Sequence, residues 1–223
     1  MQKRDSFIGV FDSGIGGLSV LQVCKAVLPN EKFIYYADTP HAPYGNKSND
    51  YIKQRVFAIS EMFIKNGAKA IVVACNTATN VGIKMLRERY KIPFVGLEPA
   101  IKPASATEGR VLLLCTNATA NQEKFKELVK KYGNSNLVIL PQNNLAAIIE
   151  KNYPNVETVK QEIKNILAPQ KRVKAIILGC THYVLVEHCF KEIFSEIAGS
   201  DIIIFNGNLG AANRLKSLLM FSP

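Results

Sequence analysis

Two cysteines in this chain share one setting, directly after an apolar strand-like run and directly before a helical stretch. Cys75 follows the run at 70–74, Ala-Ile-Val-Val-Ala, and Cys180 follows the run at 175–179, Ala-Ile-Ile-Leu-Gly. We interpret this similarity as an internal repeat that places one cysteine in each half of the chain. A single cysteine at the end of a strand is more often structural, but a matched pair favours a functional role.

The expected positions of these thiols support a specific chemistry. Ligands of open parallel sheets bind beyond the carboxyl ends of the strands. The unpaired N–H groups and the positive dipole at a helix start favour a thiolate and a bound carboxylate. Two thiols that face each other can invert a carbon next to a carboxylate, because one removes a proton and the other returns a proton to the opposite face. The residues therefore predict the inversion of a carbon that bears a carboxylate, carried out by the two thiols themselves.

Further polar residues are expected near the same sheet edge. Asp12 ends the first strand and opens the glycine-rich turn at 12–17, and His182 stands two residues after Cys180. The turn can also be a tight strand-to-helix connection capped by Ser13, and the histidine can be a helix cap. The remaining polar turn residues, which are candidates for substrate binding or for helix capping, are Tyr44, Gly45, Asn76 and Thr77.

The elements that must position these groups alternate between strand and helix. Strands are expected at 7–11, 33–37, 70–74, 94–96, 111–114, 137–140, 173–178 and 202–205, and helices at 17–28, 51–66, 77–90, 121–131, 144–152, 156–167, 182–197 and 209–219. Continuous Val and Ile runs predict parallel sheets that are covered on both faces. We expect an α/β fold of two similar parallel-sheet domains, one made of residues 1–97 plus 205–223 and the other of residues 98–204.

Composition and charge limit the class of protein. The 223 residues are 48% hydrophobic and 21% charged, which predicts a folded chain with a sizeable core. No apolar run approaches the ~20 residues of a membrane span, and no signal segment is recognised. The five cysteines include no Cys-x-x-Cys pair, so we expect reduced thiols and a cytoplasmic location. A net charge of +10 favours a solvated basic surface, with no dedicated nucleic-acid module.

Five segments resemble the glutamate racemases of the cofactor-independent aspartate/glutamate racemase superfamily. They occur in family order across much of the chain. The segments lie at 11–19 (FDSGIGGLS), 35–45 (YYAD to PYG), 74–78 (ACNTA), 96–99 (GLEP) and 179–183 (GCTHY).

This resemblance implies an active site in the cleft between two α/β domains, no cofactor and no metal. Cys75 and Cys180 would be the acid–base pair, with Asp12 and His182 as supporting proton-transfer groups. The implied substrate contacts are Asp12, Ser13, Pro43, Tyr44, Gly45, Asn76, Thr77, Thr116, Thr119, Glu150, Thr181 and His182. The implied product is D-glutamate for peptidoglycan synthesis, and the implied assembly is a homodimer.

The chain departs from this family at a few places. Family members continue past the expected last helix, residues 205–208 replace an Asp-Ser-Gly-like segment, and Cys115 stands where glycine is common. The segments that carry the expected catalytic residues are intact.

Three other functions fit part of the sequence. An aspartate racemase is the nearest alternative, although such relatives usually carry Glu at the position of His182. A dinucleotide-binding oxidoreductase would need a third glycine where Ser19 stands. A metal-binding module is suggested by Cys180, His182, His188 and Cys189, but zinc-type spacing is missing.

Overall fold

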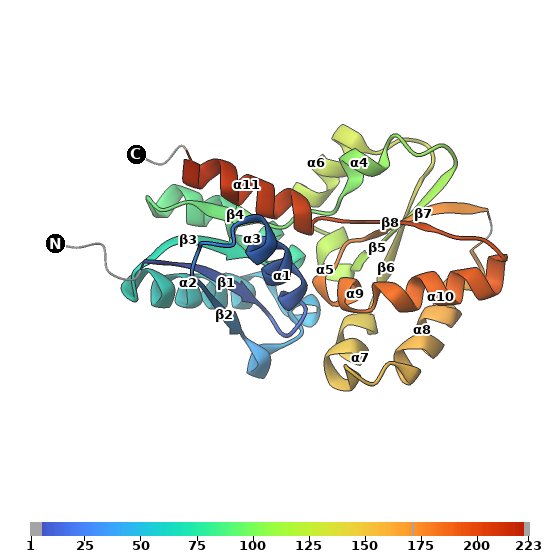
Figure 1. Ribbon diagram of the computed structural model, residues 1–223, viewed down its shortest axis with the longest axis horizontal. Helices are drawn as coiled ribbons and strands as arrows, with labels where there is room; N and C mark the ends of the chain where they lie inside the picture. The colour runs from blue at the N-terminus through green and yellow to red at the C-terminus, as the bar shows by residue number, and fades with distance from the viewer. Residues whose placement is uncertain (1–5, 171, 221–223) are drawn as a thin grey trace.

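The computed structural model describes residues 6–170 and 172–220 and contains two parallel four-stranded sheets (Figure 1). The first sheet has the order β2-β1-β3-β4, with β1 (Phe7–Asp12), β2 (Phe33–Ala37), β3 (Ala68–Val73) and β4 (Phe94–Gly96). The second has the order β6-β5-β7-β8, with β5 (Arg110–Thr116), β6 (Leu137–Gln142), β7 (Val173–Leu178) and β8 (Ile203–Asn206). The strand order is repeated, so β3 and β7 occupy matching places. The predicted α/β fold of two similar parallel-sheet units is confirmed.

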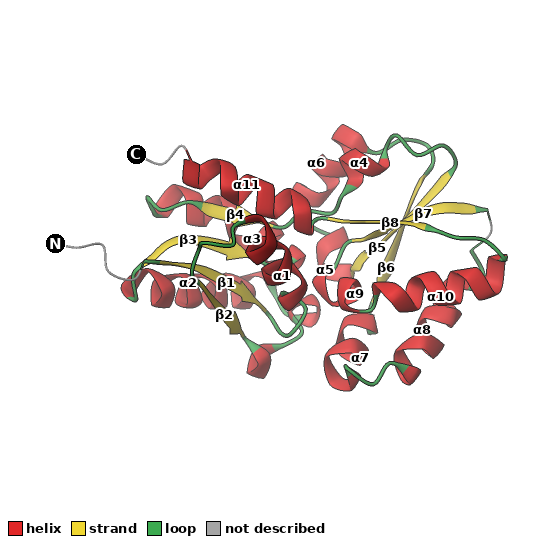
Figure 2. Cartoon of the chain, in the orientation of Figure 1, coloured by secondary structure: helices red, strands yellow, loops and turns green. Residues whose placement is uncertain are grey.

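Helices cover both faces of each sheet (Figure 2). The helices of the first half are α1 (Leu18–Val27), α2 (Asn49–Lys65) and α3 (Asn76–Arg89), with the short 3-10 turns η1 (Thr39–His41) and η2 (Tyr44–Asn46). Those that follow are α4 (Ile101–Ala104), α5 (Asn117–Ala120), α6 (Glu123–Tyr132), α7 (Leu145–Asn152), α8 (Glu157–Leu167), α9 (Thr181–Leu185), α10 (Glu187–Ala198) and α11 (Asn208–Met220).

The core of the first half has two layers, because alternate strand residues point to opposite faces of the sheet. On one face Phe11 and Val73 pack with residues of α2 and α3. On the other face Val10 and Val72 pack with α1 and with Leu215 of α11. The last helix therefore returns the chain from the second sheet to the first.

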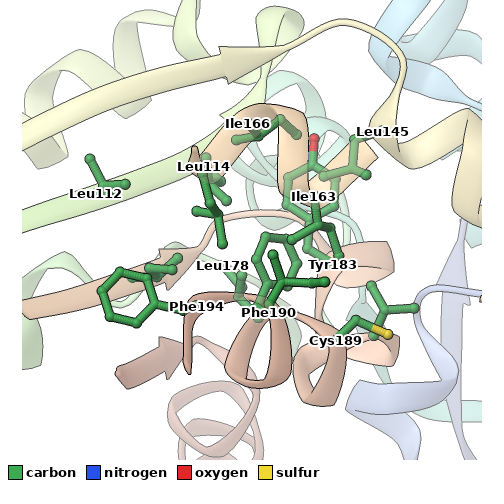
Figure 3. Packing of buried hydrophobic residues seen from close by; sticks show 14 of the residues in the cluster. Leu112, Leu114, Leu145, Ile163, Ile166, Leu178, Tyr183, Cys189, Phe190 and Phe194 are labelled. Atoms are coloured by element: carbon green, nitrogen blue, oxygen red, sulfur yellow. The ribbon is translucent and has the colours of Figure 1, made fainter. Parts of the chain in front are cut away.

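The second half is packed in the same way, and its larger core cluster lies between the sheet, α8 and α10 (Figure 3). Leu114 of β5 and Leu178 of β7 meet Phe190 of α10 in this cluster. Tyr183 of α9 is fully buried there. The burial of Tyr183 fixes the start of α9, where Thr181 and His182 stand.

Some elements differ from the sequence prediction. The prediction of a single helix at 182–197 is wrong, because Val186 has the non-helical angles φ −114° and ψ 26° and separates α9 from α10. Val186 is fully buried, so the periodic pattern of apolar residues continues through the break between the helices. The pattern therefore gave no sign of this break in the sequence. The short elements α4, α5, η1 and η2 were not predicted, since a few residues show no periodicity.

The proposed division into residues 1–97 plus 205–223 and residues 98–204 stays a prediction. β8 ends at Asn206, two residues inside the segment assigned to the first domain. Over residues 6–170 and 172–220, none of the helices combines the length and the apolar character that a membrane crossing requires.

Candidate active site

One small cavity lies between the two halves, at the carboxyl ends of the strands of both sheets. It is lined by Ser13, Pro43, Tyr44, Gly45, Cys75, Asn76, Thr77, Thr116, Ala146, Cys180, Thr181 and His182. Its volume is about 10 Å³, room for a single water molecule. The two cysteines that follow β3 and β7 thus line the same small cavity.

Cys75 is held at the start of α3 in an acidic setting. It is the N-cap residue of that helix, and its Sγ accepts a hydrogen bond from the N–H of Ala78 at 3.5 Å. Burial and the nearby carboxylate of Asp12 raise the pKa of the Cys75 thiol well above its usual range, and charge on Cys180 adds to this effect. The thiol form is therefore favoured at Cys75 while Asp12 is charged.

Asp12 connects the two halves. Its Oδ1 accepts a hydrogen bond from the N–H of Ser13 at 2.6 Å, and its Oδ2 accepts one from Oγ1 of Thr181 at 2.9 Å. The side chain is fully buried, and this burial raises the pKa of the Asp12 carboxyl although His182 and the hydrogen bonds oppose the rise. Asp12 is thus placed to hold or release a proton beside Cys75.

Cys180 stands beside a histidine that is bonded on both sides. Sγ of Cys180 lies 3.8 Å from Nδ1 of His182, and Nε2 of His182 lies 2.6 Å from Oε2 of Glu150 on α7. Burial lowers the pKa of His182, but the bonds to Cys180 and Glu150 outweigh it and raise the pKa to about 10. Burial also opposes ionisation of Glu150, but its bond to His182 lowers the pKa of the carboxyl below the usual value. The imidazole is therefore cationic at neutral pH.

Glu150 also reaches the glycine-rich turn of the first half. Its Oε2 accepts a hydrogen bond from the N–H of Ile15 at 2.9 Å. A Cβ atom at Gly14 would overlap the Glu150 carboxylate, and one at Gly16 would overlap Thr181 and His182. The glycines are required here because the halves approach this closely.

Three threonine hydroxyls form a second connection between the halves. Oγ1 of Thr77, on α3, lies 3.1 Å from Oγ1 of Thr116 and 3.3 Å from Oγ1 of Thr119. Thr116 and Thr119 are themselves 3.0 Å apart. The hydroxyls are buried, so they supply polar atoms in a setting that excludes water.

Tyr44 contributes its ring to the cavity rather than its hydroxyl. The hydroxyl donates a hydrogen bond to Oδ2 of Asp38 at 2.6 Å, and burial together with Asp38 raises the pKa of Tyr44 above its usual value. Gly45 lies against Thr116 of the second half. The amide of Asn76 donates to the carbonyl of Leu97 at 3.3 Å, in the segment that leads to the second half.

The structure therefore brings all of the sequence-predicted site residues to one place. Most of them line the cavity, while Asp12, Thr119 and Glu150 reach it through hydrogen bonds to lining residues. Ala146 of α7 also lines the cavity and was not predicted. An alanine on an apolar helix face carries no chemical signal in a sequence.

The structure also bears on two of the alternative functions. Two sheets of order 2-1-3-4 differ from the single six-stranded sheet of a dinucleotide-binding fold. Cys180 contacts His182 and Cys189 contacts His188, as two separate pairs. Within the described part of the chain, His, Cys, Asp and Glu side chains form no group of three or more that could hold a metal ion.

Known proteins share this architecture. Residues 8–202 match the family described as Asp/Glu/Hydantoin racemase. A glutamate racemase of Clostridium perfringens is 46% identical over 97% of this chain and 84% of its own length. The crystal structure of Escherichia coli glutamate racemase in complex with L-glutamate and the activator UDP-MurNAc-Ala has a TM-score of 0.87 and 32% identity, and the match covers 98% of this chain and 84% of that one. A Francisella tularensis glutamate racemase in complex with D-glutamate has a TM-score of 0.77 and 30% identity, over 96% and 81% of the two chains.

The fold and the shared cavity thus define a racemase, an isomerase that acts on amino acids. The chain belongs to the Asp/Glu/Hydantoin racemase family, and the relatives that it matches here are glutamate racemases.

Proposed function

We propose that this chain interconverts L-glutamate and D-glutamate by proton transfer between the α-carbon and two cysteines. The observation that carries the proposal is the placement of Cys75 and Cys180, from different halves, in the wall of one cavity. The names of the relatives support glutamate as the substrate. The solved relatives were crystallised with L-glutamate in one case and D-glutamate in the other.

In the proposed reaction one sulfur, as a thiolate, removes the α-proton and becomes a thiol. The electron pair left on the α-carbon is shared with the substrate carboxylate. The second sulfur, as a thiol, donates its proton to the opposite face and becomes a thiolate. One C–H bond breaks and another forms, no electrons are lost or gained, and the reverse direction exchanges the roles of Cys75 and Cys180.

The neighbouring groups fit the two roles. Asp12 lies beside Cys75 and the protonated His182 lies beside Cys180, so each sulfur has its own acid–base partner. Asn76 and Thr77, at the start of α3, and Thr116 line the cavity. We propose the N–H groups of this helix start and the two threonine hydroxyls as donors for a carboxylate. We propose these residues, with Ser13, Pro43, Tyr44, Gly45, Asn76, Thr119, Glu150 and Thr181, as the binding site.

The proposed reaction requires the site to open. A cavity of about 10 Å³ holds one water molecule and cannot admit glutamate. The two halves must separate for binding and close again, because closure strengthens the electrostatic interactions of the site.

The test is an incubation of L-glutamate with the purified protein in deuterated water, followed by circular dichroism and mass analysis. We expect optical activity to be lost as deuterium enters at the α-carbon, with no effect of added pyridoxal phosphate. Turnover of L-aspartate without turnover of L-glutamate would instead assign the aspartate racemase activity.

Three wider features belong to the same proposal. D-Glutamate would serve peptidoglycan synthesis. A cytoplasmic location agrees with five free cysteines, since the cytosol keeps thiols reduced. A homodimer is expected from the family resemblance, and sedimentation of the purified protein would test it.

A further inference from the structure

A partly buried ion pair lies behind the segment that carries Pro43, Tyr44 and Gly45. Asp38 directly follows β2, and its side chain is completely buried. Arg55 of α2 donates two hydrogen bonds to it, from Nε to Oδ2 at 2.8 Å and from Nη2 to Oδ1 at 2.7 Å. Such a two-pronged pair fixes both the distance and the plane of the carboxylate.

The same carboxylate holds Tyr44. Oδ2 of Asp38, which accepts from Arg55, also accepts the hydrogen bond from the Tyr44 hydroxyl at 2.6 Å. Tyr44 is 1% exposed and lines the cavity together with Cys75. Arg55 itself is absent from the cavity wall, so Asp38 connects it to a residue that forms the wall.

Asp38 is also fixed to the catalytic edge of the first sheet. Its N–H donates to the carbonyl of Asp12 at 3.0 Å. Beyond Tyr44, a Cβ atom at Gly45 would lie 3.3 Å from Cβ of Thr116, so the segment has little room to shift toward the second half. The chain from Arg55 through Asp38 to Tyr44 therefore sets the position of one wall of the site.

We propose that Arg55 is a positioning residue of the racemase site, which fixes Tyr44 and Gly45 beside Cys75 and Thr116 through Asp38. The inference rests on the proposed function and adds a residue that touches no substrate. Without the guanidinium, Asp38 would be a buried carboxylate without its counter-ion, which is strongly unfavourable. The segment would then shift, and a displacement of about 1 Å near reacting groups can cost on the order of 10²-fold in rate.

The kinetic test compares Arg55→Gln, Arg55→Lys and Tyr44→Phe with the unchanged protein on both enantiomers of glutamate. We expect Arg55→Gln to lower kcat/KM by about tenfold or more, mainly through KM, because a substrate-binding wall is displaced. Lysine keeps the positive charge but lacks the planar guanidinium that forms two hydrogen bonds. The kcat/KM of Arg55→Lys should therefore lie between those of Arg55→Gln and the unchanged protein. The double variant Tyr44→Phe with Arg55→Gln should be no worse than the poorer single variant, since both act through Asp38.

Arg89→Gln is the matched control, because Arg89 lies in the same half but forms an exposed ion pair with Glu61, at 3.3 Å, and is absent from the cavity wall. It should leave kcat and KM unchanged. If Arg55→Gln matches this control, the inference is overturned. If Arg55→Gln does not fold, the kinetics of Tyr44→Phe test the inference in its place. Unchanged kinetics of Tyr44→Phe would then overturn the inference.

A second readout needs no turnover. In timed alkylation with iodoacetamide and peptide mass analysis, Arg55→Gln should speed the reaction of Cys75 several-fold relative to Cys24 and Cys189. General destabilisation would instead speed all three buried thiols alike and would contradict a positioning role. Absence of glutamate racemisation in the unchanged protein would reject the proposed function, whereas this labelling comparison would still report on Arg55.

Discussion

The halves that carry Cys75 and Cys180 share a strand order but differ in the charge that they place beside the sulfur. Each cysteine follows the third strand of its sheet in sequence order and precedes a helix. Cys75 lies beside the carboxyl of Asp12, whereas Cys180 lies beside the cationic imidazole of His182. A repeated scaffold has thus acquired two unlike electrostatic environments.

This difference matters because a two-base reaction needs unlike protonation states at its start. One sulfur must be a thiolate and the other a thiol, and unlike charged neighbours favour a different protonation state at each sulfur. Hydrogen bonds also join the two environments to the opposite halves. Asp12 accepts one from Thr181, and Glu150, which is bonded to His182, accepts one from Ile15. Each half therefore supplies the charged neighbour of its own sulfur, and closure adds a hydrogen bond from the opposite half to Asp12 and to Glu150.

The largest effect is expected from removing either sulfur. Cys75→Ser and Cys180→Ser should each reduce racemisation by about 10³-fold or more, because general acid–base catalysis contributes up to ~10⁴-fold. Each variant should retain exchange of the α-proton with deuterated water on one enantiomer, and the two should prefer opposite enantiomers. Nuclear magnetic resonance of L- and D-glutamate measures this exchange.

Cys24→Ala is the control for the cysteine variants, since Cys24 is buried on α1 and lies outside the cavity lining. It should keep the activity. A single enantiomer preference shared by Cys75→Ser and Cys180→Ser would contradict the assignment of one sulfur to each face.

The next effect concerns the charged partners. Asp12→Asn and His182→Asn should each lower kcat by roughly 10- to 100-fold, because a supporting proton-transfer group is lost while both sulfurs remain. The two variants should slow opposite directions more strongly, since each partner serves a different cysteine. Measurement of kcat from L- and from D-glutamate tests this, and equal losses in both directions for both variants would contradict it.

A smaller effect is expected in the pH dependence of stability. His182 has a pKa of about 10 in the folded protein against 6.5 ordinarily, so its stabilising contribution is full below pH 6.5 and is lost as the pH rises toward 10. Glu150→Gln removes a partner that raises this pKa. Thermal unfolding midpoints between pH 6.5 and 10 should therefore fall less steeply for Glu150→Gln than for the unchanged protein.

Glu123→Gln, at the exposed pair with Lys126, is the control for the pH series and should keep the original slope. If Glu150→Gln also keeps it, the high pKa of His182 does not depend on Glu150.

The smallest effect is expected at the threonine cluster that joins the halves. Thr119→Val removes one buried hydroxyl and should lower the free energy of unfolding by about 1 kcal/mol, the usual contribution of one hydrogen bond. Thr158→Val on the exposed face of α8 is the matched control and should lower the free energy of unfolding by a smaller amount. Urea unfolding measures both, and equal losses would show that the Thr119 hydroxyl contributes nothing specific.

Much of the fold follows from local patterns. Val and Ile runs such as 70–74 and 173–178 predicted the strands because fully buried parallel strands are apolar along their length. The ends of these runs also placed Cys75 and Cys180 at helix starts, as the structure shows. Resemblance to a family, rather than any pattern of spacing, supplied Glu150, Thr116 and Thr119.

The remaining features of the site depend on tertiary packing. Closure of the halves brought both sulfurs to one cavity. Packing within each half turned the Tyr44 hydroxyl toward Asp38 and paired Glu150 with His182. Arg55 had no signal in the sequence, because an arginine on a helix resembles any solvated charge until its partner is known. Apolar periodicity is a property of one element at a time, whereas these contacts join different elements and exist only after those elements have packed together.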